Sequence, residues 1–182
     1  MSQVKTPDPV LLIMGVLHQS DSELDPVIAR LESNFGSLLH LSDPIPFTFS
    51  DYYDKEMGSN LQRRLLAFYD LIAPERLAKI KRVTNVIEDD HCDRDGGRTI
   101  NLDPGYISLF HMILASCKAF AHRPYLGMGV YADLTLLWKH GKFETLPWTY
   151  PDYADKKLMD ILTDYRSRYV DMLKQQTEQG TL

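Results

Sequence analysis

Hydrophobic positions in the first part of the chain alternate between strand and helix spacing. Residues 10–17 form a short, continuously apolar run, which predicts a strand buried on both faces. Apolar residues then recur at helical spacing over 24–35. The proline-rich segment 43–49 predicts an edge strand, because proline cannot donate to a sheet ladder. Residues 65–72 are apolar and aromatic enough for a further strand, so this part is expected to run β-α-β-β.

A second helix and strand follow in the pattern. Pro74 suits the first turn of a helix whose apolar stripe ends at Ile87, and residues 98–102 return as a strand. Residues 106–121 carry apolar side chains at helical spacing. They follow Asp103-Pro104-Gly105, which has the features of a helix N-terminus: a capping carboxylate, then proline in the first turn. The sequence therefore predicts a helix over 106–121.

The remaining pattern predicts a hairpin and a last helix. Residues 130–138 alternate apolar and polar, and His140-Gly141 can turn this strand into a partner over 143–146. Residues 158–172 have the spacing of an amphipathic helix.

These elements predict an α/β (α+β) fold in a single domain over residues 1–182, with a core over about 10–173 and flexible termini. The first six elements, β-α-β-β-α-β, are compatible with a ferredoxin-like core. A helix, a β-hairpin and the C-terminal helix would extend it. A chain of 182 residues is long enough to bury such a core.

Net charge, cysteine content and hydropathy indicate which partners and which cellular compartment the protein has. The net charge of −5 lacks the basic footprint of a duplex-DNA binder. Cys92 and Cys117 form no CxxC pair, which fits a reducing compartment. The apolar run 10–17 is too short to span a bilayer. We therefore expect a cytoplasmic protein without a membrane or duplex-DNA partner.

Common chemical motifs are absent from the sequence. It contains no GxxxxGK[ST], no GxGxxG after a strand and no GxSxG. The acidic turn over residues 89–97 lacks a spaced pair of ligands, so no metal site is predicted. The sequence identifies no cofactor and leaves open whether the protein is an enzyme.

Cationic residues gather toward the end of the predicted 106–121 helix. His111, Lys118 and His122 would share one face of it, and Arg123 follows directly. Arg123 is a natural bidentate partner for a carboxylate or phosphate, and His122 could act as an acid or base near neutral pH. The alternative is an ordinary solvated helix face.

Polar and aromatic residues later in the chain could complete a pocket. Tyr131 and Asp133 lie on the polar face of the 130–138 strand, which otherwise simply faces water. Trp148 and Tyr150 belong to a segment dense in aromatic residues and proline. That segment is either a stacking wall for a planar ligand or a structural lid over the core.

Several strings in fixed order carry a family resemblance: DYYDKEMG, IAPERLAKIKRVTN, NLDPGYISL, HRPYLGMGVYADLTL and LPWTYPDY. From about residue 10 to 169 the chain resembles an uncharacterised prokaryotic family, domain of unknown function 4416. The resemblance implies a small single-domain protein with no established activity, and it assigns no residue roles. The matching motif residues are Tyr52, Tyr53, Glu56, Asp103, Tyr106, Lys118, His122, Arg123, Tyr131 and the stretch 148–153.

The leading functional hypothesis is binding of a small anionic ligand, such as a nucleotide-like or phosphorylated molecule. Lys118, His122 and Arg123 would line the site. Its walls would come from Tyr106, Tyr131, Asp133, Trp148 and Tyr150. If a reaction occurs, His122 with Asp103 or Glu56 would supply acid/base chemistry. The alternative is a non-catalytic interaction or assembly module that uses the Trp/Tyr/Pro segment, and a homodimer is left open.

Overall fold

The computed structural model describes residues 3–93 and 96–178. In chain order the elements are β1 (Val10–His18), α1 (Asp21–Phe35), β2 (Leu38–Leu41), β3 (Ile45–Pro46), α2 (Asp54–Met57), β4 (Gln62–Ile72), the 3-10 turn η1 (Pro74–Arg76), α3 (Leu77–Asp89), β5 (Ile100–Ile107), β6 (His111–Ser116), β7 (Tyr125–Gly127), β8 (Val130–Lys139), β9 (Lys142–Thr145) and α4 (Lys156–Glu178). The last helix thus runs past residue 173. The predicted flexibility of the outermost termini, residues 1–2 and 179–182, lies outside the described residues.

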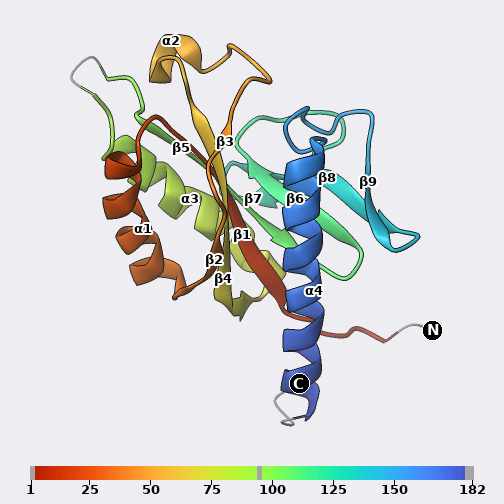
Figure 1. Ribbon diagram of the computed structural model, residues 1–182. Helices are drawn as coiled ribbons and strands as arrows, with labels where there is room; N and C mark the ends of the chain where they lie inside the picture. Colours follow the sequence, from red (N-terminus) through yellow and green to blue (C-terminus); the bar gives the residue numbers. More distant parts are fainter. Residues whose placement is uncertain (1–2, 94–95, 179–182) are drawn as a thin grey trace.

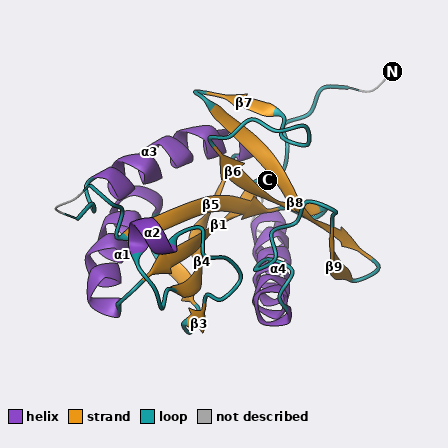
Figure 2. Ribbon diagram, turned by 90° about the horizontal axis from the view of Figure 1, so that it is seen from above, coloured by secondary structure: helices purple, strands orange, loops and turns teal. Residues whose placement is uncertain are grey.

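Within the described residues, the strands form one antiparallel sheet in the order β2-β4-β1-β5-β6-β8-β7. The short strands β3 and β9 pair with β4 and β8 at its margins. Helices α1 and α3 lie on one side of this sheet, and α4 crosses the other (Figure 1). The chain therefore has an α+β fold, as the sequence predicts, and helices cover both faces of the central strands (Figure 2).

Strand β1 shows why its sequence is apolar at almost every position. Val10, Leu12, Met14 and Val16 pack against α1 and α3 in one core cluster. Leu11 and Ile13 face the other way and pack with the buried side of α4 in a second cluster. Because successive side chains of a strand point to opposite faces, a strand buried on both sides reads as a continuous apolar run.

Most predicted elements occur close to their expected positions. The apolar run at the N-terminus is β1, the Pro74 helix is η1 followed by α3, the 130–138 strand is β8, and its hairpin partner is β9. The strands of the predicted βαββαβ unit correspond to β1, β3, β4 and β5, of which β4, β1 and β5 are neighbours in that order and β3 pairs with β4, whereas β2 was not predicted. The ferredoxin-like assignment of this unit stays a prediction.

The predicted helix over residues 106–121 is wrong. Asp103, Pro104 and Gly105 lie inside β5, which then turns through Ser108 into β6. The Ser108 backbone N–H donates to the His111 carbonyl at 2.9 Å, and its hydroxyl accepts from the backbone N–H groups of Phe110 and His111. The apolar spacing of this segment coincided with a helical period, but Phe110 is 72% exposed. Its actual period is the two-residue alternation of a hairpin.

The Pro104-Gly105 pair has a sheet-specific role. Gly105 is the first β5 residue paired with β6, and a β-carbon there would collide with the Ile113 carbonyl. On the N-terminal side of Gly105 the two strands separate. Leu102 directs its backbone groups to the same edge as Pro104, because alternate residues of a strand face the same neighbour. At that edge β6 no longer pairs with β5. The missing N–H of Pro104 therefore costs no sheet hydrogen bond.

Side chains of α3 take the place of β6 at Leu102. The Glu88 carboxylate accepts from the Leu102 backbone N–H at 2.5 Å, and Lys81 Nζ donates to the Leu102 carbonyl at 2.8 Å. Both side chains are buried. Burial raises the pKa of Glu88, against the opposing effect of the Lys81 charge. The side chains of Lys81 and Glu88 on α3 thus fill the gap between β5 and β6.

Candidate functional site

A cleft of about 810 Å³ opens beside the part of the sheet that α4 leaves uncovered. Arg63, Leu65 and Ala67 alternate along β4 and face the same side. Leu65 and Ala67 pack in the α4 core, whereas Arg63 lines the cleft. The walls come from the segment 47–53, from α3, from the separated ends of β5 and β6, and from residues 150–153.

The lining of the cleft combines aromatic and charged side chains. The aromatic residues are Phe47, Phe49, Tyr52, Tyr53, Tyr150 and Tyr153. The charged residues are Arg63, Lys81, Arg82, Glu88, Asp89, Arg98, Asp103, Lys118, Asp133 and Asp152.

Arg63 organises the floor of the cleft. Its Nη1 donates to Asp103 Oδ2 at 3.1 Å, and its Nη2 donates to Asp152 Oδ2 at 2.8 Å. Asn101 also donates to Asp103 Oδ2, at 2.9 Å. The side chains of Arg63 and Asp152 are buried, while Asp103 is one-quarter exposed. Burial raises the pKa of Asp152 and the nearby Arg63 charge opposes that rise.

Tyr153 lies beside Arg63 and is buried. The Arg63 guanidinium carbon is 5.6 Å from the centre of the Tyr153 ring and 5.4 Å from that of Phe47. The Tyr153 hydroxyl has no hydrogen-bond partner in the described part of the chain. Burial raises the pKa of this hydroxyl well above its usual range. The floor therefore contains a protonated phenol whose hydrogen-bonding capacity is unused.

A second arginine, Arg98, connects α2 to the floor of the cleft. Arg98 Nε and Nη2 donate to the two carboxylate oxygens of Glu56 at 2.6 and 2.9 Å. Its Nη1 donates to Asn101 Oδ1 at 3.1 Å. The hydrogen bond from Arg98 lowers the pKa of Glu56. Glu56 is therefore held as the partner of a cation, and no contact joins it or Asp103 to His122 within the described residues.

Arg123 lies next to the cleft, because its donors bind the lining residues Ser116, Asp133 and Tyr150. Its Nε donates to the buried Asp133 carboxylate at 2.7 Å, and its Nη2 donates to the Tyr150 hydroxyl at 2.5 Å. Its Nη1 contacts Ser116 Oγ at 3.2 Å and the Lys118 carbonyl at 3.1 Å. This arginine holds β6, β8 and the residue-150 segment together. The sequence predicted these residues as ligand contacts, a role that stays a prediction.

His122 stacks on Trp148, with ring centres 4.6 Å apart and planes at 12°. His122 Nε2 lies 3.5 Å from Asp133 Oδ2 and makes no hydrogen bond with the described part of the chain. The Trp148 indole N–H donates to the Leu134 carbonyl at 2.8 Å. Neither ring lines the cleft. The pair instead lies beside Asp133, the ion-pair partner of Arg123.

Lys118 stands at the cleft with a phenol as its partner. Its Nζ donates to the Tyr52 hydroxyl at 3.0 Å and lies 4.9 Å from the ring centre. Both residues are exposed, and the hydrogen bond from Lys118 lowers the pKa of Tyr52. No carboxylate of the described residues forms an ion pair with Lys118, which distinguishes it from Arg63, Arg98 and Arg123.

Two predicted wall residues lie elsewhere. Tyr106 packs against the core beside α3, with its ring 6.0 Å from that of His111. Tyr131 packs on Tyr125 at 5.1 Å, near the β7 edge. Neither lines the cleft. The predicted alignment of His111, Lys118 and His122 on one helix face is wrong, because His111 lies on β6 and the other two follow that strand.

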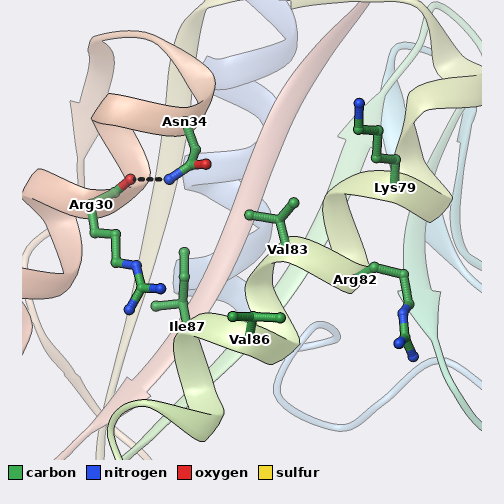
Figure 3. Close-up of a pocket in the computed structure, with 7 residues that line it drawn as sticks. All are labelled: Arg30, Asn34, Lys79, Arg82, Val83, Val86 and Ile87. Carbon is green, nitrogen blue, oxygen red and sulfur yellow. Dashed lines mark hydrogen bonds between the residues drawn. The ribbon is translucent and has the colours of Figure 1, made fainter.

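A shallower groove of about 380 Å³ lies between α1 and α3. Figure 3 shows Arg30 and Asn34 of α1 facing Val83 and Ile87 of α3, while Lys79 and Arg82 project away from Arg30. Arg30 forms an ion pair with Asp90 at 2.6 Å. This groove lacks the aromatic walls and the buried polar groups of the cleft.

Neither a cluster of metal ligands nor a membrane-spanning helix occurs in the described residues. No group of three or more His, Cys, Asp or Glu side chains there is placed to hold a metal ion. Asp95, part of the acidic 89–97 turn, lies outside that description. No helix in residues 3–93 and 96–178 is long and apolar enough to cross a membrane.

Comparison with known proteins identifies a family but no function. The family model described as "Domain of unknown function (DUF4416)" matches residues 8–169, which is most of the chain. No match was found among curated proteins or among solved structures. The chain belongs to this DUF4416 family.

Proposed function

We propose that this member of a family of unknown function binds a small anionic ligand with a planar ring, such as a nucleotide-like or phosphorylated molecule. The cleft would be the site. Its volume of about 810 Å³ falls within the range typical of small-molecule pockets. Phe47, Tyr52 and Tyr150 offer aromatic surface against which a planar ring can pack.

The observation that carries this proposal is the position of Lys118. Arg63 and Arg98 of the cleft lining, and Arg123 next to the cleft, are paired with carboxylates, so the charge of these three arginines is already compensated. Among the described residues, the Lys118 ammonium has only the Tyr52 phenol as a partner, in a cation–π and hydrogen-bonded contact. An anionic group arriving at the cleft mouth would gain a charge-assisted hydrogen bond there. Arg82 is a second exposed cation of the lining without an ion pair among the described residues.

A cytoplasmic location accompanies the proposal. Cys92 and Cys117 are both exposed free thiols. Such thiols persist in a reducing compartment, where small phosphorylated metabolites are abundant.

The test is a thermal-shift and calorimetric titration with AMP, GMP, CMP, UMP and inorganic phosphate. At least one nucleotide should raise the melting temperature and show saturable binding. Lys118→Ala should weaken that binding strongly. Lys142→Ala, which removes an exposed lysine on β9 away from the cleft, should leave it unchanged. Absence of binding by all five probes, or equal binding by Lys118→Ala, would overturn the proposal.

The alternative function is a protein–protein interaction or assembly module. Phe120 (66% exposed) meets the ring of His122 edge-on, and His122 stacks on Trp148 (36% exposed), so two exposed aromatic side chains flank a mostly buried histidine. Aromatic side chains of this kind are enriched in interface hot spots. Light scattering coupled to gel filtration tests it: a dimer that Trp148→Ala dissociates, together with negative ligand titrations, would favour this alternative. A monomer at all concentrations would reject self-association.

A further inference from the structure

We infer that the cleft binds a ligand that carries a diphosphate group, with one phosphoryl group at Lys118 and the next at Arg82. This inference rests on the proposed function and narrows the class of ligand from phosphorylated molecules in general to diphosphate esters, such as nucleoside diphosphates. Two exposed cations on different walls of the cleft support this assignment.

Arg82 belongs to the face of α3 that packs against the end of β6. Ala78, one turn before Arg82, packs in a core cluster with Ala115 of β6. Asn85, one turn after Arg82, donates from Nδ2 to Cys117 Sγ at 3.5 Å. Because residues three and four apart share a face of a helix, Arg82 lies between these two contacts. It is exposed and lines the cleft at this position.

Lys118 lies on the other side of the same contact, because it directly follows Cys117. Its ammonium group donates to the Tyr52 hydroxyl at 3.0 Å, so it is held at the wall formed by the segment 47–53. Arg82 belongs to the wall formed by α3. The two cations therefore offer two anchor points, and a diphosphate can extend from one to the next.

The other cations of the lining are already engaged within the described residues. Arg63 and Arg98 form ion pairs with carboxylates. Lys81 is buried and donates to a backbone carbonyl of β5. Arg82 and Lys118 are exposed, and neither forms an ion pair with a carboxylate of the described residues. Their positive charge is therefore available to a ligand.

Carboxylates on the neighbouring elements leave this positive charge largely uncompensated. Asp89, on α3, is exposed and lines the cleft, but it follows Arg82 by seven positions, which is about 10 Å along the helix axis. Asp133, on β8, is buried and paired with Arg123 at 2.7 Å. Positive charge therefore predominates where α3 meets the end of β6, which favours a polyanion there.

A diphosphate matches the donors of these two side chains. The guanidinium of Arg82 presents a planar fork of N–H groups, which can bind two oxygens of one phosphoryl group. The ammonium of Lys118 is a compact point charge that binds the adjoining phosphoryl group. A phosphate monoester carries a charge of about −1.5 to −2 near pH 7, and a second phosphoryl group adds negative charge and acceptor oxygens. Arg82 therefore contributes little to the binding of a monophosphate and strongly to that of a diphosphate.

Calorimetric titration of the intact chain compares each nucleoside diphosphate with its monophosphate: ADP with AMP, GDP with GMP, CDP with CMP and UDP with UMP. The buffer contains EDTA, which keeps divalent metals off the phosphates. For the base that binds, the diphosphate should bind at least about tenfold more tightly, the effect of one charge-assisted hydrogen bond. Arg82→Met should bring the two affinities close together and leave that of the monophosphate nearly unchanged.

Arg76→Met is the matched control. It makes the same substitution at an exposed arginine that lines neither the cleft nor the groove between α1 and α3, and it should keep the preference for the diphosphate. An equal loss of this preference in Arg82→Met and Arg76→Met would show a general effect of charge and would reject the diphosphate site.

Inorganic anions test the diphosphate apart from the rest of the nucleotide. Pyrophosphate should compete with the bound nucleotide more strongly than phosphate does, and this difference should disappear in Arg82→Met. Equal competition by the two anions in the wild type would contradict a site for two phosphoryl groups.

The outcomes also distinguish this inference from the proposed function. Lys118→Ala should weaken the diphosphate and the monophosphate alike. If the two bind equally in the wild type, and both depend on Lys118, the diphosphate site is rejected while the anion site stands. Absence of binding by all eight nucleotides and both inorganic anions rejects both.

Discussion

The hydroxyl group of Tyr153 occupies the space that a side chain at Gly15 would need. Gly15 lies in the middle of β1, where it pairs with Leu65 on β4 and Asp103 on β5. A β-carbon built on Gly15 would overlap the Tyr153 hydroxyl oxygen and lie 2.9 Å from Arg63 Nη1. The glycine in an otherwise apolar strand thus lets the polar floor of the cleft approach the sheet backbone.

Gly15→Ala should destabilise the protein by about 1–3 kcal/mol, because the new methyl group forces Tyr153 and Arg63 out of their positions. Tyr153→Phe alone should be nearly neutral, since it removes a buried hydroxyl that has no partner among the residues the structure describes. In the double variant the phenylalanine should recover part of the loss. Urea denaturation of the four proteins measures this. Full wild-type stability in Gly15→Ala would contradict the close approach.

Arg63→Met should cost about 3–5 kcal/mol of the free energy of unfolding. It would leave the carboxylates of Asp103 and Asp152 at the floor without their cation. Arg64→Met is the control on the neighbouring residue. Arg64 pairs with Asp21, whose side chain is 66% exposed, so this change should cost no more than about 1 kcal/mol. Chemical denaturation of both variants provides the comparison, and equal losses would show that the floor ion pairs carry no special weight.

The sequence was sufficient to predict those elements in which the spacing of apolar residues follows directly from which side chains are buried. β1, α3, β8 and the β8–β9 hairpin each show the spacing that their packing requires. It misled at 106–121, where a hairpin carries apolar residues at an accidental helical spacing and Pro104-Gly105 resembles a helix start. Only the pairing of β5 with β1 and β6 explains that dipeptide, and such pairing is not a local property.

The candidate cleft was partly predictable for the same reason. Lys118, Asp133 and Tyr150 line it, as expected from the density of cationic and aromatic residues in this part of the chain. Arg63 and Tyr153 were not predicted as partners, because they are 90 positions apart and meet only through the strand order. The available signals were an arginine alternating with apolar residues in β4 and a glycine within the apolar run of β1.

Lys81→Met should lower the free energy of unfolding by about 1–3 kcal/mol, the cost of a buried carbonyl that has lost its partner. Lys81 Nζ satisfies the Leu102 carbonyl at the edge of β5 that β6 leaves. Lys79→Met, two positions earlier on the exposed side of α3, should change stability by no more than about 0.5 kcal/mol. Hydrogen exchange adds a local measurement, because the amides of β5 should exchange faster in Lys81→Met only. Identical exchange in both variants would refute this role of Lys81.

His18 should make the protein less stable in mild acid. Burial lowers the pKa of His18, and its Nε2 is buried without a hydrogen-bond partner in residues 3–93 and 96–178. In the unfolded chain the imidazole takes up its proton near pH 6.5. In the folded chain it does so only at lower pH. The contribution to stability is therefore complete above about pH 6.5 and is lost as the pH falls toward the folded pKa, with a slope of at most about 1.4 kcal/mol per pH unit.

Urea denaturation between about pH 5.5 and 8 tests this for the wild type, His18→Gln and His140→Gln. His18→Gln should flatten the decline without abolishing it. Burial also lowers the pKa of His111, so that residue contributes in the same direction. His140→Gln shows the effect of the same substitution at an exposed turn. A decline in His18→Gln as steep as in the wild type would mean that His18 gains its proton equally well in the folded and unfolded chains.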